Sequence, residues 1–160
     1  MSGIRTFEHR FTVDAPLERV AQFHSDTRAL KILNPPPVFV QFHKVEPLGE
    51  GSVADFTLWL GPLPIHWVAV HSDFHPSRGF VDTQQSGPFD YWQHQHTFTA
   101  LSDHQTEVID VVQARFSSHP FWAIVTRLMW MNLKFMFAYR AWQTRRHTEQ
   151  ADSTQDRITV

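Results

Sequence analysis

The strongest constraint on the fold is a run of six segments in which apolar and polar residues alternate. These segments lie at 38–46, 53–60, 64–74, 79–86, 89–100 and 105–116. A period of two is typical of half-buried β-strands. The separators hold turn-forming residues, among them Gly61-Pro62 and Gly87-Pro88. Because such short links join neighbouring antiparallel strands, the pattern predicts an antiparallel meander.

Segments of other character flank this meander. A strand is predicted at 4–13, followed by short helices at 16–24 and 26–33. After the meander, 120–146 has the period and the wide apolar face of a long helix. This order predicts an α+β domain in which a seven-stranded antiparallel sheet curls around the long C-terminal helix.

Length and composition limit the class of protein. The chain has 160 residues, which fits a single domain, predicted at 1–146, with a polar tail at 147–160 that we expect to be disordered. The 14 Lys and Arg against 16 Asp and Glu give a net charge of −2, so we expect no nucleic-acid partner. The chain has no Cys, which excludes disulfides, iron–sulfur clusters and thiolate zinc sites.

The sequence also bears on location. It holds no uncharged apolar stretch of about 18 residues, so we expect no membrane span. Its first residues lack the basic and apolar regions of a signal peptide, and we expect a cytoplasmic protein. A homo-oligomer is possible, but nothing in the sequence supports one.

Several motifs resemble those of one superfamily. FTVDAPLERVAQFHSD at 11–26 resembles the opening of the START-like, or Bet v 1-like (SRPBCC), superfamily, in which a strand leads through Ala-Pro into a helix. GPLPIHWVAVHSDF at 61–74, GFVDTQQSGPFDYWQHQHTF at 79–98 and the YR at 139–140 resemble a bacterial subgroup of uncharacterised ligand-binding proteins, related to polyketide cyclase/dehydratase-like domains. The resemblance covers about 4–146. It implies a helix-grip fold with a cavity for a hydrophobic small molecule, but no particular reaction.

Strand 89–100 carries the clearest candidates for chemistry. We assign its aromatic-rich face to the inside, and that face carries Trp92, His94, His96 and Phe98. If the adjacent strands turn Asp82 and Asp110 inward, these carboxylates flank the two histidines. A buried carboxylate needs a partner, and an imidazole supplies one.

Three interpretations of this His/Asp group stay open. The group could be a structural network, it could orient the polar end of a ligand, or it could supply an acid–base pair or a metal site. In the acid–base case His94 or His96 is the base and Asp82 or Asp110 orients it. For a metal, a third ligand could come only from Asp82, Asp110 or His71, since the glutamate of the cupin pattern is absent after His96. We therefore predict no metal and no cofactor.

Further residues are predicted to line the cavity. From the strands they are Trp59, Trp67, Phe80 and Gln84, and from the long helix Met129, Asn132, Met136, Tyr139 and Arg140. Tyr139 and Arg140 could instead extend their polar ends to solvent. His9, His43, His66 and His104 are expected at the surface or at sheet edges, and no spacing singles out His24 or His71.

The leading function predicted from the sequence is binding of a hydrophobic or aromatic small molecule in an internal cavity. The first alternative is a cyclase- or dehydratase-like enzyme that uses the His/Asp group. The second is a non-catalytic interaction module in which the long helix packs on a partner protein. An open cavity would favour binding, and a large exposed apolar patch on the helix would favour the module.

Overall fold

The computed structural model describes residues 3–149. Its elements are β1 (Arg5–Val13), α1 (Leu17–Ser25), a 3-10 turn (Thr27–Ala29), α2 (Leu30–Leu33), β2 (Val38–Val45), β3 (Val53–Leu60), β4 (Leu63–His75), β5 (Gly79–Ser86), β6 (Tyr91–Ser102), β7 (Gln105–Arg115), α3 (Pro120–Met131) and α4 (Leu133–Thr148). Among these residues no helix is long and apolar enough to cross a membrane.

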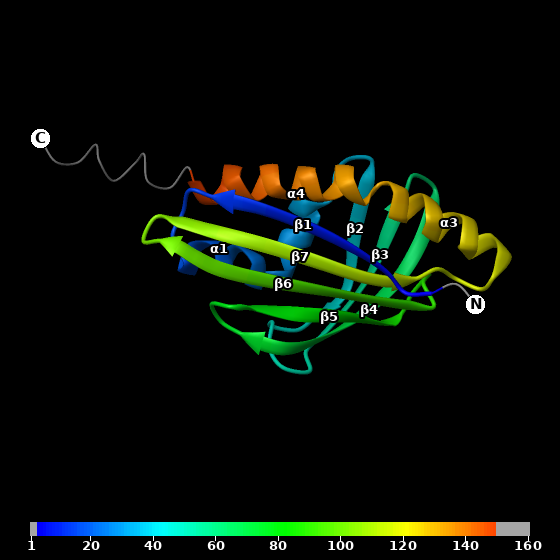
Figure 1. Cartoon of the computed structure of the whole chain (residues 1–160). Helices are drawn as coiled ribbons and strands as arrows, with labels where there is room; N and C mark the ends of the chain where they lie inside the picture. Colours follow the sequence, from blue (N-terminus) through cyan, green and yellow to red (C-terminus); the bar gives the residue numbers. More distant parts are fainter. Residues whose placement is uncertain (1–2, 150–160) are drawn as a thin grey trace, which may run out of the picture.

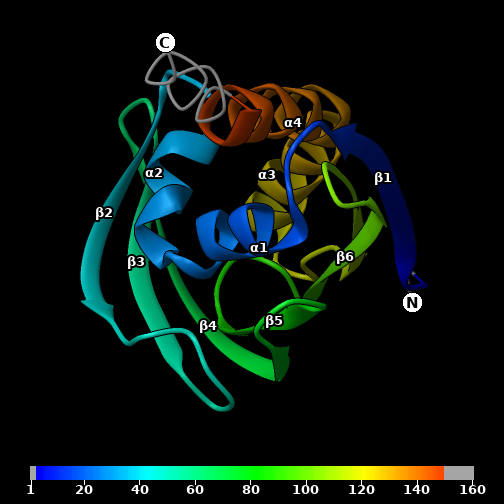
Figure 2. The same ribbon diagram turned by 90° about the vertical axis from the view of Figure 1, so that its left-hand side faces the viewer.

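The seven strands form one antiparallel sheet in the order β1-β7-β6-β5-β4-β3-β2. The predicted meander is therefore confirmed, and the first strand joins its far edge beside β7. The sheet curves strongly, and α1, α2 and α4 lie inside the curve (Figures 1 and 2). This is the predicted α+β helix-grip arrangement.

Two glycines allow the sheet to take this shape. Gly61 has a φ of 59° in the two-residue link between β3 and β4, a conformation that glycine adopts without strain. Gly79, at the start of β5, lies against β6: a Cβ there would stand 1.9 Å from the carbonyl oxygen of His96. The missing side chain at Gly79 therefore lets β5 approach the part of β6 that carries the histidines.

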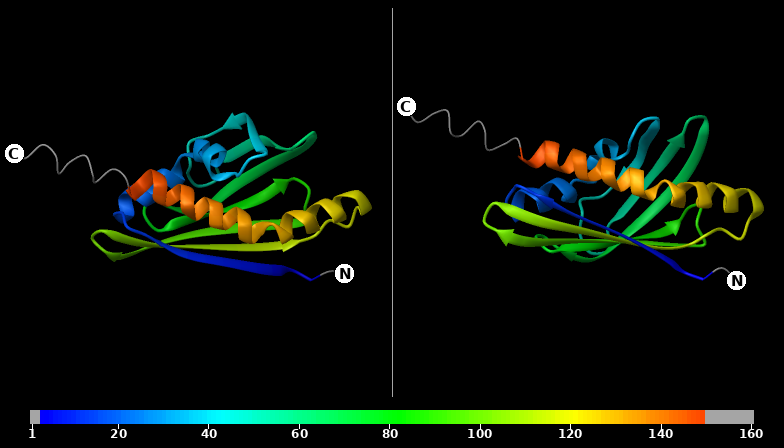
Figure 3. Two further views of the ribbon diagram at one scale, coloured as in Figure 1. Left: turned by 90° about the horizontal axis from the view of Figure 1, so that it is seen from above. Right: turned by 45° about the horizontal axis from the view of Figure 1, so that its top comes forward.

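The predicted long helix at 120–146 is interrupted at Asn132. The Asn132 side chain donates a hydrogen bond to the Leu128 carbonyl at 2.8 Å, and a polar side chain that bonds locally to the backbone competes with helix continuation. The chain changes direction between α3 and α4 (Figure 3). The prediction of one continuous helix was wrong in this respect.

The helix also extends further than predicted, since α4 includes His147 and Thr148, which we expected in the tail at 147–160. The remainder of the predicted tail, 150–160, lies outside the described residues.

Apolar side chains of the concave face pack in two groups. One lies toward α3 and the start of α4 and includes Trp67, Trp92, Phe116 and Leu133. The other lies toward α1 and includes Phe11, Val20, Phe80, Phe98 and Ala141. On β6, Trp92 belongs to the first group and Phe98 to the second. The two histidines of this strand therefore sit between two apolar regions.

Candidate functional site

Six ionisable side chains lie in two adjacent rows across the concave face of the sheet. The first row is His71, Asp82 and His94, and the second is His96, Asp110 and His9. Each row crosses neighbouring strands, so every member stands directly opposite the next one along the row. The register of the sheet thus brings five strand segments together in one polar cluster, which we call the His/Asp cluster.

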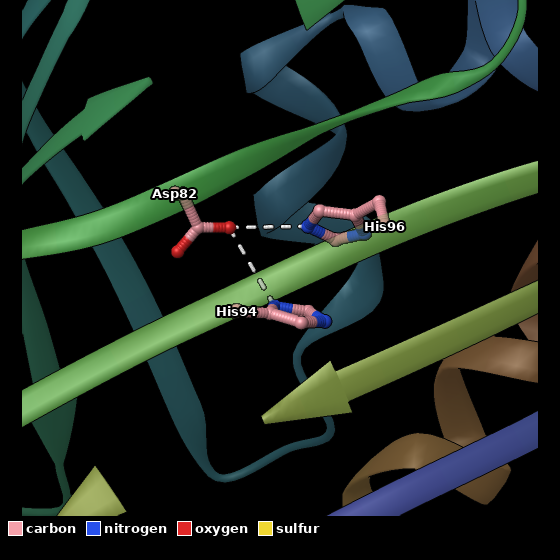
Figure 4. Close-up of side chains that lie close together, drawn as sticks. All are labelled: Asp82, His94 and His96. Carbon is pink, nitrogen blue, oxygen red and sulfur yellow. Dashed lines mark hydrogen bonds and ion pairs between the residues drawn. The ribbon is translucent and has the colours of Figure 1, made fainter. Parts of the chain in front are cut away.

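The centre of the cluster is a closely spaced group of two imidazoles and two carboxylates. His94 Nε2 donates to Asp110 Oδ1 at 3.0 Å, and His96 Nε2 donates to Asp82 Oδ2 at 3.1 Å. His94 Nδ1 lies 3.5 Å from the same Asp82 oxygen (Figure 4). His96 Nδ1 lies 3.0 Å from Asp110 Oδ1, but out of line for a hydrogen bond. All four ring nitrogens therefore face a carboxylate.

This group is shielded from solvent, which strengthens the interactions between its charges. The side chains of His94 and Asp110 are 4% and 5% exposed, and that of His96 is 10% exposed. Burial lowers the pKa of His96, but the Asp110 and Asp82 carboxylates more than offset this and raise it to about 9. Burial and the neighbouring His96 lower the pKa of His94. At neutral pH the pair therefore holds one imidazolium and one neutral imidazole.

The pKa values of the two carboxylates are lowered, whereas that of His96 is raised. Burial alone would raise the pKa of both Asp82 and Asp110. The hydrogen bond from His96 nevertheless lowers the pKa of Asp82. The hydrogen bond from His94 and the nearby charge of His96 hold the pKa of Asp110 well below its ordinary value. Both carboxylates are therefore ionised at neutral pH.

A cavity of about 690 Å³ opens above the cluster, between the sheet and the helices. Most of its lining is apolar, from α2, β3, β4, α3 and α4. The triple proline Pro35–Pro37, Gly61, Leu128 and Phe135 also belong to its lining. Leu128 and Phe135 are 54% and 62% exposed, so this side of the cavity is where it meets solvent.

Ten of the residues predicted to bind ligand line this cavity. They are Trp67, Phe80, Asp82, Trp92, His94, His96, Met129, Asn132, Met136 and Arg140.

Two predicted strand residues lie outside the lining. Trp59 points to the outer face of β3, where its indole N–H donates to Gln41 at 3.0 Å. The neighbouring positions 58 and 60 face the cavity instead. Gln84 turns toward the link between β5 and β6, where its side chain bonds the backbone N–H and carbonyl of Phe89. Its role there is to hold that turn.

Three other predicted residues are also outside the lining. Phe98 is buried in the apolar group near α1. Asp110 lies beneath the histidines and reaches the cavity only through them. The Tyr139 hydroxyl accepts a hydrogen bond from Gln143 at 2.8 Å and is turned away from the cavity.

Arg140, by contrast, points inward from α4. Its guanidinium lies 5.2 Å from the centre of the Phe137 ring, and it lines the cavity. Its Nε is buried and has no hydrogen-bond partner among the described residues. Burial lowers the pKa of Arg140, while Asp110 and Asp82 act to raise it. The extended, solvent-directed conformation considered from the sequence is therefore not the one observed.

Three histidines of the site were not among the residues predicted to bind a ligand. His71 and His24 line the cavity, and His9 belongs to the second row of the cluster. His9 lies on the edge strand β1, as expected, but its Nδ1 is buried without a hydrogen-bond partner among the described residues. The missed signals were the alternation of His9 with Phe7 and Phe11, and the position of His71 opposite Asp82 across a hairpin.

Comparison with known proteins adds the fold family. A scan of protein-family models and a search of curated protein sequences found no match. Among solved structures, the Zhui aromatase/cyclase from Streptomyces sp. R1128 matches with a TM-score of 0.72 and 14% identity, over 99% of this chain and 98% of that one. A protein from Chromobacterium violaceum matches with a TM-score of 0.72 and 16% identity, over 91% and 98%.

A third match is norcoclaurine synthase from Thalictrum flavum, in complex with dopamine and hydroxybenzaldehyde. Its TM-score is 0.62 at 12% identity, over 99% of this chain and 90% of that one. Such low identities carry information on the fold alone, and all three matches span nearly the whole domain. The chain therefore has the predicted helix-grip fold and shares it with these three proteins.

Proposed function

We propose that this protein binds a hydrophobic or aromatic small molecule, with one polar or anionic end, in the cavity between the sheet and α4. The observation that carries this proposal is the cavity itself. Its volume of about 690 Å³ lies within the range of roughly 300–1,000 Å³ that small-molecule sites occupy. A mostly apolar lining with polar groups gathered on one wall is the usual composition of such a site.

The two kinds of lining have separate roles. Apolar walls supply affinity, because burying apolar ligand surface removes it from water. The polar wall fixes the orientation, since Arg140 and the His96 imidazolium attract a carboxylate, a phenolate or an enolate. The complex of norcoclaurine synthase with two small aromatic molecules supports an aromatic ligand class on the same fold.

A cavity-filling variant tests the proposal. Ala69 lines the cavity on β4, whereas the next side chain back, Val68, lies on the other face of the sheet. Ala69→Trp should weaken binding of the neutral fluorophore N-phenyl-1-naphthylamine at least tenfold, because the indole takes up ligand space. Val68→Trp, the matched control, should leave the dissociation constant unchanged. A fluorescence titration measures both, and equal affinity of the two variants would contradict cavity binding.

A variant of Arg140 tests whether the cavity recognises an anionic end of the ligand. Arg140→Met keeps an apolar stem of similar length and removes the charge. It should weaken binding of the anionic fluorophore 8-anilinonaphthalene-1-sulfonate about tenfold, the loss of one charged hydrogen bond. Binding of neutral N-phenyl-1-naphthylamine should stay within a factor of two. Equal losses for both fluorophores would show that Arg140 acts on the shape of the cavity and not through its charge.

The arrangement of the histidines favours binding over acid–base catalysis. A general base needs a nitrogen within about 3 Å of the proton that it removes. All four ring nitrogens of His94 and His96 instead face Asp82 or Asp110 at 3.0–3.5 Å. We therefore rank the cyclase- or dehydratase-like enzyme below a binding protein.

One observation favours the interaction module as a second candidate. Exposed apolar side chains follow α3 into α4, including Ile124 at 62% and Met131 at 76% exposure. Leu128 and Phe135 in the same row also line the cavity. The exposure of Leu128 and Phe135 is therefore also explained by a ligand entrance. Binding of a small molecule remains the preferred function.

A further inference from the structure

Three side chains on the cavity wall converge on one point. The Asp82 Oδ2 atom lies 3.1 Å from His96 Nε2 and 3.5 Å from His94 Nδ1, as Figure 4 shows. Ligand atoms of all three residues lie within 4.8 Å of one another. Two donors bound to one ion at about 2.0–2.2 Å stand roughly 2.8–3.6 Å apart in adjacent positions. The two distances from Asp82 Oδ2 to the imidazole nitrogens fall in this range.

We propose that Asp82, His94 and His96 bind one divalent transition-metal ion at the base of the cavity. The donor set of two imidazoles and one carboxylate, without thiolates, suits zinc, iron(II), cobalt or nickel. The same-strand glutamate whose absence led the sequence to predict no metal is replaced here by Asp82 from the adjacent strand.

The surroundings already hold both rings in the orientation that a metal site needs. His94 donates its Nε2 proton to Asp110 at 3.0 Å, which leaves Nδ1 facing Asp82. His96 places Nδ1 3.0 Å from the same Asp110 oxygen and Nε2 toward Asp82. Metal-binding histidines usually give their second N–H to a carboxylate, which fixes the ring. Asp110 acts in this way for His94, and its carboxylate also lies 3.0 Å from His96 Nδ1.

Charge and access fit the same assignment. The ion takes the place of the Nε2 proton of His96, which is released to solvent. The two negative charges of Asp82 and Asp110 then match the charge of a divalent cation. Asp82, His94 and His96 all line the cavity, so positions of the ion not taken by protein would face it. His71 lines the same wall, and Ser52 contacts its Nδ1, which leaves Nε2 as a further donor.

A bound ion would also give the anionic end of the small molecule a direct partner. That consequence rests on the proposed function, whereas ion binding itself does not and can be measured without any organic ligand.

Metal titration of untagged protein, stripped with a chelator, tests the site. Zn²⁺ calorimetry should give one ion per chain, and Co²⁺ should produce visible absorption bands of nitrogen and oxygen coordination. Asp82→Asn and His96→Gln should each weaken Zn²⁺ binding at least 100-fold, and Asp110→Asn by about 10–100-fold. The matched control is His66→Gln, which breaks a surface pair of 2.7 Å with Asp55. This variant should bind Zn²⁺ with unchanged affinity.

Two further measurements keep the result decisive. Binding of N-phenyl-1-naphthylamine by the stripped variants shows that their cavity is folded, so loss of Zn²⁺ binding is then local. In unmutated protein, Zn²⁺ should shift the imidazole ¹⁵N resonances of His94 and His96, a readout that needs no variant. The proposal is overturned if unmutated protein binds no stoichiometric ion, if the Asp82 and His96 variants retain full affinity, or if His66→Gln loses as much. Fluorophore binding by the stripped protein reports separately on the proposed function.

Discussion

Replacing Asp110 with alanine is expected to destabilise the protein by about 3–5 kcal/mol, the usual cost of removing one partner from a buried ion pair. The Asp110 side chain is 5% exposed and lies 3.0 Å from a nitrogen of both His94 and His96. Alanine would leave two buried imidazoles without that acceptor and the imidazolium without half of its countercharge. Urea unfolding followed by circular dichroism measures the change.

Asp110→Asn is the matched variant for this prediction. Its amide oxygen can still accept the His94 Nε2 proton, so it should lose less stability than the alanine variant. A loss below about 1 kcal/mol for Asp110→Ala, the typical effect of an exposed pair, would contradict a buried ionic cluster.

The same effect should depend on pH. Because the pKa of Asp110 is lowered in the folded protein, its contribution is full above its ordinary pKa of about 4 and is lost as the pH falls through the lower folded value. Because the pKa of His96 is raised to about 9, its contribution is full below about 6.5 and is lost as the pH rises through 9. The difference in stability between unmutated protein and Asp110→Ala should therefore be largest between about pH 4 and pH 6.5.

Phe137→Ala is expected to cost a similar amount, about 3–5 kcal/mol, because it removes a large and fully buried ring. The Phe137 ring projects from α4 onto the cluster, with its centre 5.2 Å from that of His94 and 5.3 Å from that of Phe7. The Arg140 guanidinium lies over its face. Its loss would open a void between α4 and the sheet, next to the cluster.

Phe135 supplies the control for this second effect. It lies two residues earlier on the same helix and is 62% exposed, so Phe135→Ala should change stability by less than about 0.5 kcal/mol. Thermal unfolding of both variants gives the comparison. Equal losses would mean that α4 does not pack on the sheet through Phe137.

The centre of the site could be predicted from the sequence because it depends on strand alternation. A regular period of two places His94 and His96 on one face of β6 without any knowledge of the fold. The same rule turned Asp82 and Asp110 toward them, and short hairpins made the three strands neighbours. Local pattern and local connection were sufficient for these four residues.

The rest of the site depends on contacts between distant parts of the chain. His9 joins the cluster only because β1 pairs with β7, about a hundred residues later, and no local pattern specifies that pairing. His24 reaches the cavity from α1, where its position depends on packing against α4. Trp59 was predicted to line the cavity because it lies on a strand, yet Leu58 and Leu60 occupy the inner face of β3. A position on a strand did not by itself identify which face of the sheet the side chain is on.

The most direct test of the central claim is to locate N-phenyl-1-naphthylamine in the complex by NMR. With ¹³C-methyl and ¹⁵N-indole labels, saturating fluorophore should shift the methyl signals of Ala54 and Ala69 and the indole signals of Trp67 and Trp92, which all line the cavity. Shifts confined to Ile124 and Met131 on the exposed face of α3 would place the ligand on the surface and contradict a binding cavity.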